Sequence, residues 1–557
     1  MDFRRASQYL LMTALIAFLA AFLLLPLFTV ISSGCEVALF REVLLSPVCR
    51  EGLWNSLRIA VTTTAITAVI SLVLATLYDR YDFAGKEYCS LLMLLPMILP
   101  PFVGALGFQQ ILGYYGVVNT ILSDLGFERV DFLGGEGRFY AVCVIEALHL
   151  FPVFYLNLVT AMGNIDPAMD EAAANLGASA WQRFRRIRLP LLRGGFLAGG
   201  SLVLVWSFTE LGTPLMFGFN RVTPVQVFNG LNELESNPLP YTLVVVMLAV
   251  STLLYGGMKL ALGSHGGQSA VKGGSASRSR KLTGWKRGMP TLAFLLVGAF
   301  AALPHLALVG CAFSLRWYGS VLPQTFTLEH FDNALSNPLV LPSILNSLRY
   351  SSLAMALAVV LGVLAALISA RWRLRGAWAL DLLVMLPLAV PGLVIAFGYL
   401  GMTGRYVWAR AVFNPVENPL WLLAIAYAVR RIPYVVRAVQ SGLEQSPEDL
   451  ERAARNFGAG PVRTLMKITL PLVTANLLVG GLFAFSFSML EVSDSLVLAQ
   501  KSVFFPITRA LLDLAQILGS GPASACAFGV WAMAFLALTL GAAGILLGRR
   551  IGTIFKF

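Results

Sequence analysis

Five ionisable residues interrupt long apolar stretches of this sequence and are its first candidates for chemistry: Glu210, Glu491, Asp494, Arg430 and Arg431. Charged side chains are costly in hydrocarbon, so inside a membrane they usually face a cavity, a partner charge or a transport path. Glu210 and Glu491 stand 281 positions apart in matching surroundings, which makes them the strongest pair. These residues are therefore candidates to line and gate a path for a solute, although for any single one of them we favour a structural role. Buried ion pairs that join helices, or side chains that reach the membrane surface, are the alternative.

The sequence contains none of the spacings that indicate a catalytic or metal centre. It has no Gly-x4-Gly-Lys-Ser/Thr loop to cradle a nucleotide phosphate, and no His-Glu-x-x-His motif. The cysteines show no zinc-binding spacing, and the four histidines are scattered at positions 149, 265, 305 and 330. We therefore expect no catalytic residue, no metal site and no cofactor bound by this chain.

Two segments with one spacing indicate a different chemistry, the docking of another protein. The first reads Glu-Ala-Ala, three residues, Gly, nine residues and Ile-x-Leu-Pro, and the second keeps this spacing but has Arg452 at the first position. We call residues 163–193 the first elbow and residues 441–473 the second elbow. The residues that carry the pattern are Glu171, Ala172, Ala173 and Gly177 in the first elbow, and Glu451, Ala453, Ala454 and Gly458 in the second.

Each elbow predicts two short helices joined by a sharp turn. Proline can begin a helix, alanine-rich turns form helix readily, and Gly177 and Gly458 permit the turn. After the turn Trp181, Phe184 and Ile187 recur at helical spacing, with arginines on the other faces. Such a helix can dock into a groove of a partner. The alternative is a pair of ordinary basic loops, which would not explain the matched spacing.

The composition predicts a membrane protein built from helices. The 557 residues are 57% hydrophobic and 13% charged, with a mean hydropathy of +0.75, whereas soluble domains are about 45–50% apolar and about 25% charged. The apolar residues form blocks of about 20, the length that crosses a bilayer as a helix. We predict an all-α polytopic protein with about 12 transmembrane helices, at 9–32, 54–78, 88–112, 138–162, 194–218, 239–262, 289–314, 342–370, 378–402, 419–440, 474–500 and 523–547.

The basic residues orient this array. They cluster between the predicted spans, and short basic loops stay in the cytoplasm, so both termini are expected inside the cell. The net charge of +12 does not indicate a nucleic-acid partner, because the clusters are separated by spans and form no single face. Cys35 and Cys49 fall in one outer segment, where a disulfide is allowed but not required.

The two sets of six spans are copies of one another. Asn-Ser-Leu-Arg at 55–58 recurs at 346–349, and Pro96 and Pro100 recur as Pro387 and Pro391. A unit repeated in one orientation is a parallel duplication, with its pseudo-two-fold axis along the membrane normal and any pathway at the seam. The prolines break helix hydrogen bonds, and either mark kinks beside the path or only shape the packing. The predicted domains are 1–262 and 287–557, joined by a flexible, solvated cytoplasmic linker at 263–286.

The elbows resemble the EAA loops of ABC-importer permeases, and the whole chain resembles a fused permease with two homologous six-helix domains. That group imports ferric iron, thiamine, polyamines, sulfate and 2-aminoethylphosphonate. The resemblance implies a bacterial inner-membrane location, two copies of an ABC ATPase subunit that bind ATP and contact the elbows, and a periplasmic solute-binding protein. The stretch 210–214 is similar to ferric-iron members, whereas 491–498 is more similar to the phosphonate branch, so both solutes remain candidates.

Two other functions fit parts of the sequence. A secondary transporter also has twelve spans in two halves, but it would give no reason for paired elbows. An intramembrane enzyme would require a catalytic constellation in the spans, and the sequence shows none with recognisable spacing.

Overall fold

Helices form almost all of the regular structure in a computed structural model, which describes residues 3–98, 100–233, 237–262, 280–282 and 284–547. Within these residues the strands are short. β1 (Tyr81–Asp82) pairs in parallel with β2 (Arg280–Lys281), and β3 (Ser314–Arg316) pairs antiparallel with β4 (Thr325–Phe326). The predicted all-α polytopic fold is confirmed.

Eight helices in the described part of the chain are long and apolar enough to cross a membrane, and three bent helix pairs raise the number to 11. The predicted span at 419–440 is the one missing from this set. It forms α22 (Leu420–Gln445), which carries Arg430, Arg431 and Arg437 and is therefore too polar to qualify by composition. With α22 included, the helices correspond to the twelve predicted spans.

The two halves repeat the same order of elements. The helices of the first half are α1 (Phe3–Leu19), η1 (Ala20–Leu24), α2 (Leu25–Gly34), α3 (Val37–Leu45), α4 (Pro47–Arg80), α5 (Lys86–Leu92), η2 (Leu95–Ile98), α6 (Pro101–Leu112), α7 (Val117–Asp124), α8 (Gly137–Gly163), α9 (Pro167–Asn175), α10 (Ala180–Arg183), η3 (Phe184–Arg188), α11 (Leu189–Leu191), α12 (Arg193–Phe208), α13 (Gly212–Met216), α14 (Thr223–Asn229), η4 (Gly230–Glu233) and α15 (Leu239–Leu262).

The second half begins with η5 (Gly284–Gly288) and α16 (Met289–Phe313). It continues through α17 (Glu329–Ser336), α18 (Val340–Ala366), η6 (Leu367–Trp372), α19 (Ala377–Ala389), α20 (Gly392–Arg405), α21 (Val407–Phe413), α22, α23 (Glu448–Asn456), α24 (Pro461–Thr464), η7 (Leu465–Thr469), α25 (Leu470–Leu472), α26 (Thr474–Met489), α27 (Ser493–Leu498), η8 (Ser502–Phe504), α28 (Ile507–Ala515) and α29 (Gly521–Leu547).

The third span of each half is broken at its second proline. The two pieces meet at 92° around Pro100 and at 105° around Pro391. Both prolines adopt the same extended conformation and lie directly before the second helical piece, with ψ of 142° and 139°. Proline has no N–H to continue a helix, so the predicted spans 88–112 and 378–402 are bent rather than straight.

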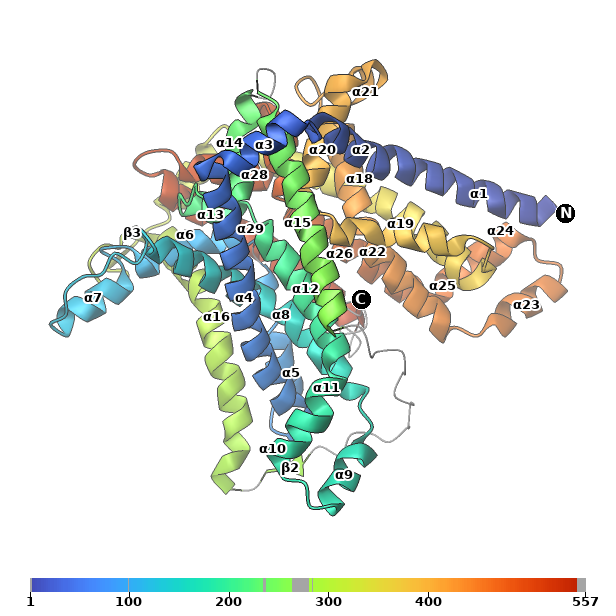
Figure 1. Cartoon of the computed structure of the whole chain (residues 1–557), viewed down its shortest axis with the longest axis horizontal. Coiled ribbons are helices and arrows are strands. Elements are labelled where there is room, and N and C mark those ends of the chain that lie inside the picture. The colour runs from blue at the N-terminus through green and yellow to red at the C-terminus, as the bar shows by residue number, and fades with distance from the viewer. Residues whose placement is uncertain (1–2, 99, 234–236, 263–279, 283, 548–557) are drawn as a thin grey trace.

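The first span of each half packs against the other half. α2 lies along α20, and α16 lies along α6. Figure 1 shows α1 and α2 extending over the second half, while α16 runs beside α4 of the first. The last span of each half packs against the first span of the same half: α15 packs on α2, and α29 packs on α16. Each bundle therefore contains one helix that the sequence assigns to the other copy.

Glycines make the exchanged contacts close. A Cβ at Gly107 of α6 would stand 2.2 Å from the backbone oxygen of Pro304, and one at Gly398 of α20 would stand 2.7 Å from that of Pro26. Both contacted oxygens belong to a proline in the first span of the other half. The missing side chains of the two glycines give this backbone room.

The predicted linker and the two outer cysteines are two further expectations from the sequence. The linker prediction covers 263–286, of which residues 263–279 and 283 lie outside the described residues. Within the described part, Arg280 and Lys281 pair with β1, and the flexible, solvated linker stays a prediction. Cys35 and Cys49 are both free thiols, the first exposed and the second buried.

Candidate functional site

The first elbow is a turn between two short helices whose ends are capped. Asp166 begins α9 by accepting a hydrogen bond from the Ala168 N–H at 2.9 Å. Ser179 and Gln182 form a capping box at the start of α10. Between them Gly177 has φ +85°, in the left-handed region that favours glycine. The predicted helix–turn–helix is therefore present, and Gly458 repeats it in the second elbow with φ +81°.

An ion-pair network ties the first elbow to the end of the second span. The Asp170 carboxylate of α9 forms an ion pair with the Arg188 guanidinium of η3 at 3.1 Å, and the same guanidinium pairs with Asp79 of α4 at 3.3 Å. Arg183 also reaches Asp170, at 3.4 Å. We call Asp79, Arg188 and Asp170 the first clamp.

The second elbow is tied down at the equivalent place with different chemistry. Glu451 of α23 accepts a hydrogen bond from the Thr469 hydroxyl at 3.0 Å and pairs with Arg371 of η6 at 3.2 Å. Arg371 also donates to the Ser446 carbonyl at 2.9 Å. We call Arg371, Glu451 and Thr469 the second clamp. Glu451 and Thr469 stand 281 positions after Asp170 and Arg188 of the first clamp.

The residues at the first Glu-Ala-Ala position point away from these clamps. Glu171 is exposed, and among the described residues it makes no ion pair. Arg452 is also exposed and pairs with Glu448 of its own helix at 3.1 Å. The departure from the motif therefore changes the outward face of the second elbow and leaves its anchor intact.

The elbows expose large apolar side chains at matching positions. Leu176 and Phe457, directly before the two turn glycines, are 89% and 92% exposed. The other matched exposed pairs are Met169 with Leu450, Trp181 with Val462, and Leu191 with Leu472, and Met466 is exposed in the second elbow alone. Exposed apolar side chains repeated on two arms are typical of protein-interaction surfaces.

A second charged group lies at the seam between the halves. Arg430 and Arg431 of α22 both pair with the Glu491 carboxylate, in the turn between α26 and α27. Arg430 also stands 3.5 Å from Asp494, whose side chain makes no hydrogen bond within the described part of the chain. Glu491 and Asp494 are 5% and 0% exposed. Four of the five predicted pathway residues therefore form one buried ion-pair group.

Glu210 reaches this group from the first half. Its carboxylate accepts from the Thr213 backbone and hydroxyl, at 3.3 and 3.4 Å, and lies within electrostatic range of Glu491. Glu146 of α8 lies within electrostatic range of Glu210, and it accepts a hydrogen bond from Ser207. We call Glu146, Glu210, Glu491 and Asp494 the acidic line.

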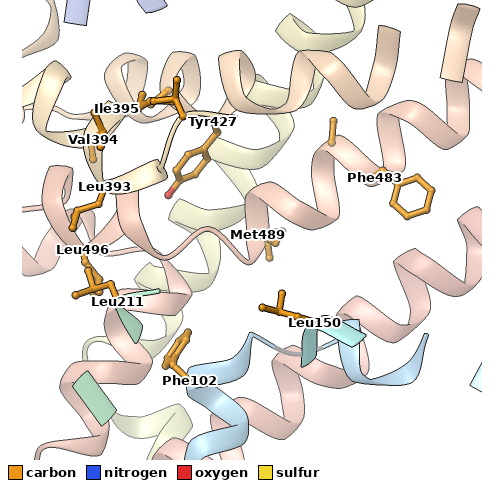
Figure 2. Close-up of a cluster of buried hydrophobic side chains, with 14 of the residues drawn as sticks. Phe102, Leu150, Leu211, Leu393, Val394, Ile395, Tyr427, Phe483, Met489 and Leu496 are labelled. Atoms are coloured by element: carbon orange, nitrogen blue, oxygen red, sulfur yellow. The ribbon is translucent and has the colours of Figure 1, made fainter. Parts of the chain in front are cut away.

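Apolar side chains from both halves form one buried cluster. Figure 2 shows part of it, with Phe102, Leu150 and Leu211 from the first half, and Leu393, Tyr427, Met489 and Leu496 among those from the second.

On the side away from the elbows, α14 and α28 meet across the seam. The Arg509 guanidinium lies over the ring of Phe228, 5.7 Å from its centroid, and over Phe505 at 5.1 Å. Arg509 also pairs with Asp513 at 3.2 Å. Burial raises the pKa of the Asp513 carboxyl, and the Arg509 charge limits that rise. A cation–π contact thus joins the halves at this end.

Comparison with known proteins accounts for the repeat and the elbows together. The profile of the family described as "Binding-protein-dependent transport system inner membrane component" matches residues 70–264 and again 358–551. The chain belongs to this family. Both matches contain one elbow, so the chain carries two inner-membrane transport components in one polypeptide.

Individual relatives of this family member share the fused architecture over most of its length. The Fe(3+)-transport system permease protein FbpB 2 of Haemophilus influenzae is 24% identical over 508 residues, covering 88% of this chain and 90% of that protein. The ferric transport system permease protein FbpB of Actinobacillus pleuropneumoniae is 26% identical, covering 80% of this chain and 64% of that protein. A crystal structure of a bacterial ABC transporter for alginate import matches 47% of this chain at 17% identity, with a TM-score of 0.40.

The geometry adds residues that the sequence analysis did not select. Glu146 joins the acidic line, and its signal was a carboxylate inside the apolar stretch 138–162. The clamps add Asp170 beside Glu171 and show why Glu451, not Arg452, holds the second elbow. The signal was the alignment of Asp170 with Glu451. By contrast His149 bonds the Pro96 carbonyl of the third span at 2.9 Å.

Proposed function

We propose that this chain is the permease of an ATP-driven importer for ferric iron. The observation that carries the proposal is the pair of elbows, one in each six-span half, with matched apolar side chains exposed on both. Two docking arms of the same fold fit two copies of an ABC ATPase subunit that bind the ATP, while this chain binds no cofactor. A periplasmic binding protein delivers the solute on the opposite side.

The contacts proposed for the ATPase are the outward residues of the two motifs. They are Glu171, Ala172, Ala173 and Gly177 in the first elbow, and Ala453, Ala454 and Gly458 in the second. Glu451 belongs to the same turn but faces Arg371 and Thr469, so its part is to hold the elbow. Short apolar side chains beside glycine let another surface approach closely.

The charges at the seam favour a cation over 2-aminoethylphosphonate. Arg430 and Arg431 are both engaged by Glu491, so neither is free to receive an anion. The acidic line contains four carboxylates against these two guanidinium groups, and Glu210 and Glu146 have no basic partner among the described residues. Two relatives named for ferric transport support the same choice.

The proposed cycle moves the two bundles around this line. ATP binding closes the ATPase pair, the elbows turn the bundles, and the seam changes the side to which it opens. The Arg509–Phe228 contact separates when the seam opens toward the binding protein. We place the elbows and both termini in the cytoplasm, and the two domains at 1–262 and 287–557 of a bacterial inner-membrane protein.

Reconstituted transport tests this function. The tagged chain should copurify with an ATPase, and vesicles containing the assembly should take up ferric iron only with ATP and binding protein present. Uptake should survive an ionophore that collapses ion gradients, and excess 2-aminoethylphosphonate should not compete. Uptake that needs no ATP and stops with the gradient would overturn the proposal. Uptake of the phosphonate instead of iron would overturn the cation assignment alone.

A further inference from the structure

Each elbow has two adjacent positions with opposite orientations. In the first elbow Asp170 is turned inward, with a side chain that is 17% exposed, while the next residue, Glu171, is exposed. In the second elbow Glu451 is 12% exposed and Arg452 is 64% exposed. The outward residue faces away from the rest of the chain, and the inward residue faces the helix bundle.

The inward acid contacts elements on both sides of the elbow turn. Asp170 precedes Gly177, whereas Arg188 follows it and also reaches Asp79 at the end of the second span. Backbone hydrogen bonds close the turn, among them Ala178 N–H to the Ala173 carbonyl at 3.0 Å, but a Cβ at Gly177 would meet nothing within 4 Å, so no side-chain packing supports the turn. The clamp joins both helices to the span, and it therefore ties the angle between the elbow helices to the position of α4.

The second clamp reaches the same result with other side chains. Glu451 precedes Gly458, Thr469 follows it, and Arg371 comes from the helix that continues the second span. The side chains of Arg371 and Glu451 are only 7% and 12% exposed, so solvent screens this pair far less than a surface pair. Two chemically different triads that connect the same three elements indicate a shared mechanical task.

We propose that Asp170 and Glu451 are positioning residues that transmit elbow movement to the second span of their own half. An ATPase that displaces α9 or α23 pulls on α4 or η6 through the clamp. The proposal rests on the proposed function, since it needs an ATPase to move the elbows. It adds the route by which that movement enters the bundle.

The chain itself supplies a rescue design. In the second half the span ends with Ala370 and Arg371, and the equivalent positions in the first half are Asp79 and Arg80. Arg188→Thr alone leaves Asp79 and Asp170 without their shared cation. The triple variant D79A/D170E/R188T rebuilds the chemistry of the second clamp, with the native Arg80 in the place of Arg371.

The readout is solute transported per ATP hydrolysed by the full assembly in vesicles, with ferric citrate as the probe. We expect R188T to lower this ratio about fivefold to tenfold while ATP hydrolysis continues, and the triple variant to restore most of it. Glu451→Gln should uncouple the second half, whereas Asp449→Asn, which removes an 87% exposed carboxylate of the same helix, should not.

Normal coupling in both R188T and E451Q, or a triple variant no better than R188T, would overturn the inference. The same holds if D449N uncouples as strongly as E451Q, because total elbow charge would then be responsible. Should R188T fail to accumulate in the membrane, Asp170→Asn replaces it in the comparison with the same expectation. Failure of the unmodified assembly to couple ATP to uptake would instead count against the proposed function.

Discussion

Gly107 of α6 and Gly398 of α20 occupy the same place in the two halves, and each receives the backbone beside a proline from a helix of the other half. The contact is duplicated although Pro26 and Pro304 lie in spans with little other sequence in common. These two equivalent close contacts fix the position of each exchanged first span against the third span of the other half.

Adding a methyl group at either glycine should loosen this contact. We expect Gly107→Ala and Gly398→Ala each to destabilise the protein by about 1–3 kcal/mol, because the new Cβ would overlap packed backbone. The midpoint of thermal unfolding in detergent measures the effect. Gly404→Ala, on the same helix as Gly398 but with nothing within 4 Å, is the control. Equal midpoints for the control and both variants would refute the tight fit.

Substitution of the turn glycines of the elbows should lower uptake for a different reason, which is backbone strain. Gly177 and Gly458 have positive φ but open space around a Cβ, so alanine there strains the backbone by about 1–2 kcal/mol without a clash. We expect lower uptake from Gly177→Ala and Gly458→Ala at normal membrane levels, and a larger loss with bulky residues. Gly194→Ala, in open space at ordinary φ, should transport normally. Full transport by both turn variants would contradict the role of the elbows.

Truncating the exposed apolar side chains should weaken partner binding without harming the fold. Trp181 and Phe457 are 66% and 92% exposed, so little packing is lost in Trp181→Ala or Phe457→Ala. Interface anchors of this kind are worth about 2 kcal/mol or more, so ATPase affinity should fall about tenfold or more. Titration of the ATPase subunit against the purified chain measures this. Val407→Ala, an equally exposed change on α21, should bind normally.

Glu491 should be the least replaceable carboxylate of the acidic line. Glu491→Gln leaves two buried guanidinium groups without their shared partner, and breaking a buried pair costs about 3–5 kcal/mol. The double variant R431Q/E491Q keeps Arg430 with Asp494 and should unfold at a higher temperature than E491Q. Glu210→Gln should keep its stability and lose iron uptake. An E491Q protein as stable as the unmodified chain would argue against the ion-pair group.

The span pattern and the duplicated elbows could be predicted from the sequence, because apolar blocks and repeated spacing are local features. The exchange of α2 and α16 could not be predicted, because the sequence of an apolar span does not show which other helix it packs against. Pro100 and Pro391 signalled a disturbance, but the angles of 92° and 105° depend on the helices packed around them. The pairing of Arg430 and Arg431 with Glu491 was one of two open alternatives until the tertiary fold brought α22 to the seam.

Glu171 and Arg452 give the two elbows opposite outward charges at the same position. A homodimeric motor seated on this permease would meet a carboxylate with one subunit and a guanidinium with its twin. Its two nucleotide sites would then differ in their response to ionic strength, although one gene encodes both. The duplicated permease would thus make the two halves of a symmetric ATPase dimer inequivalent.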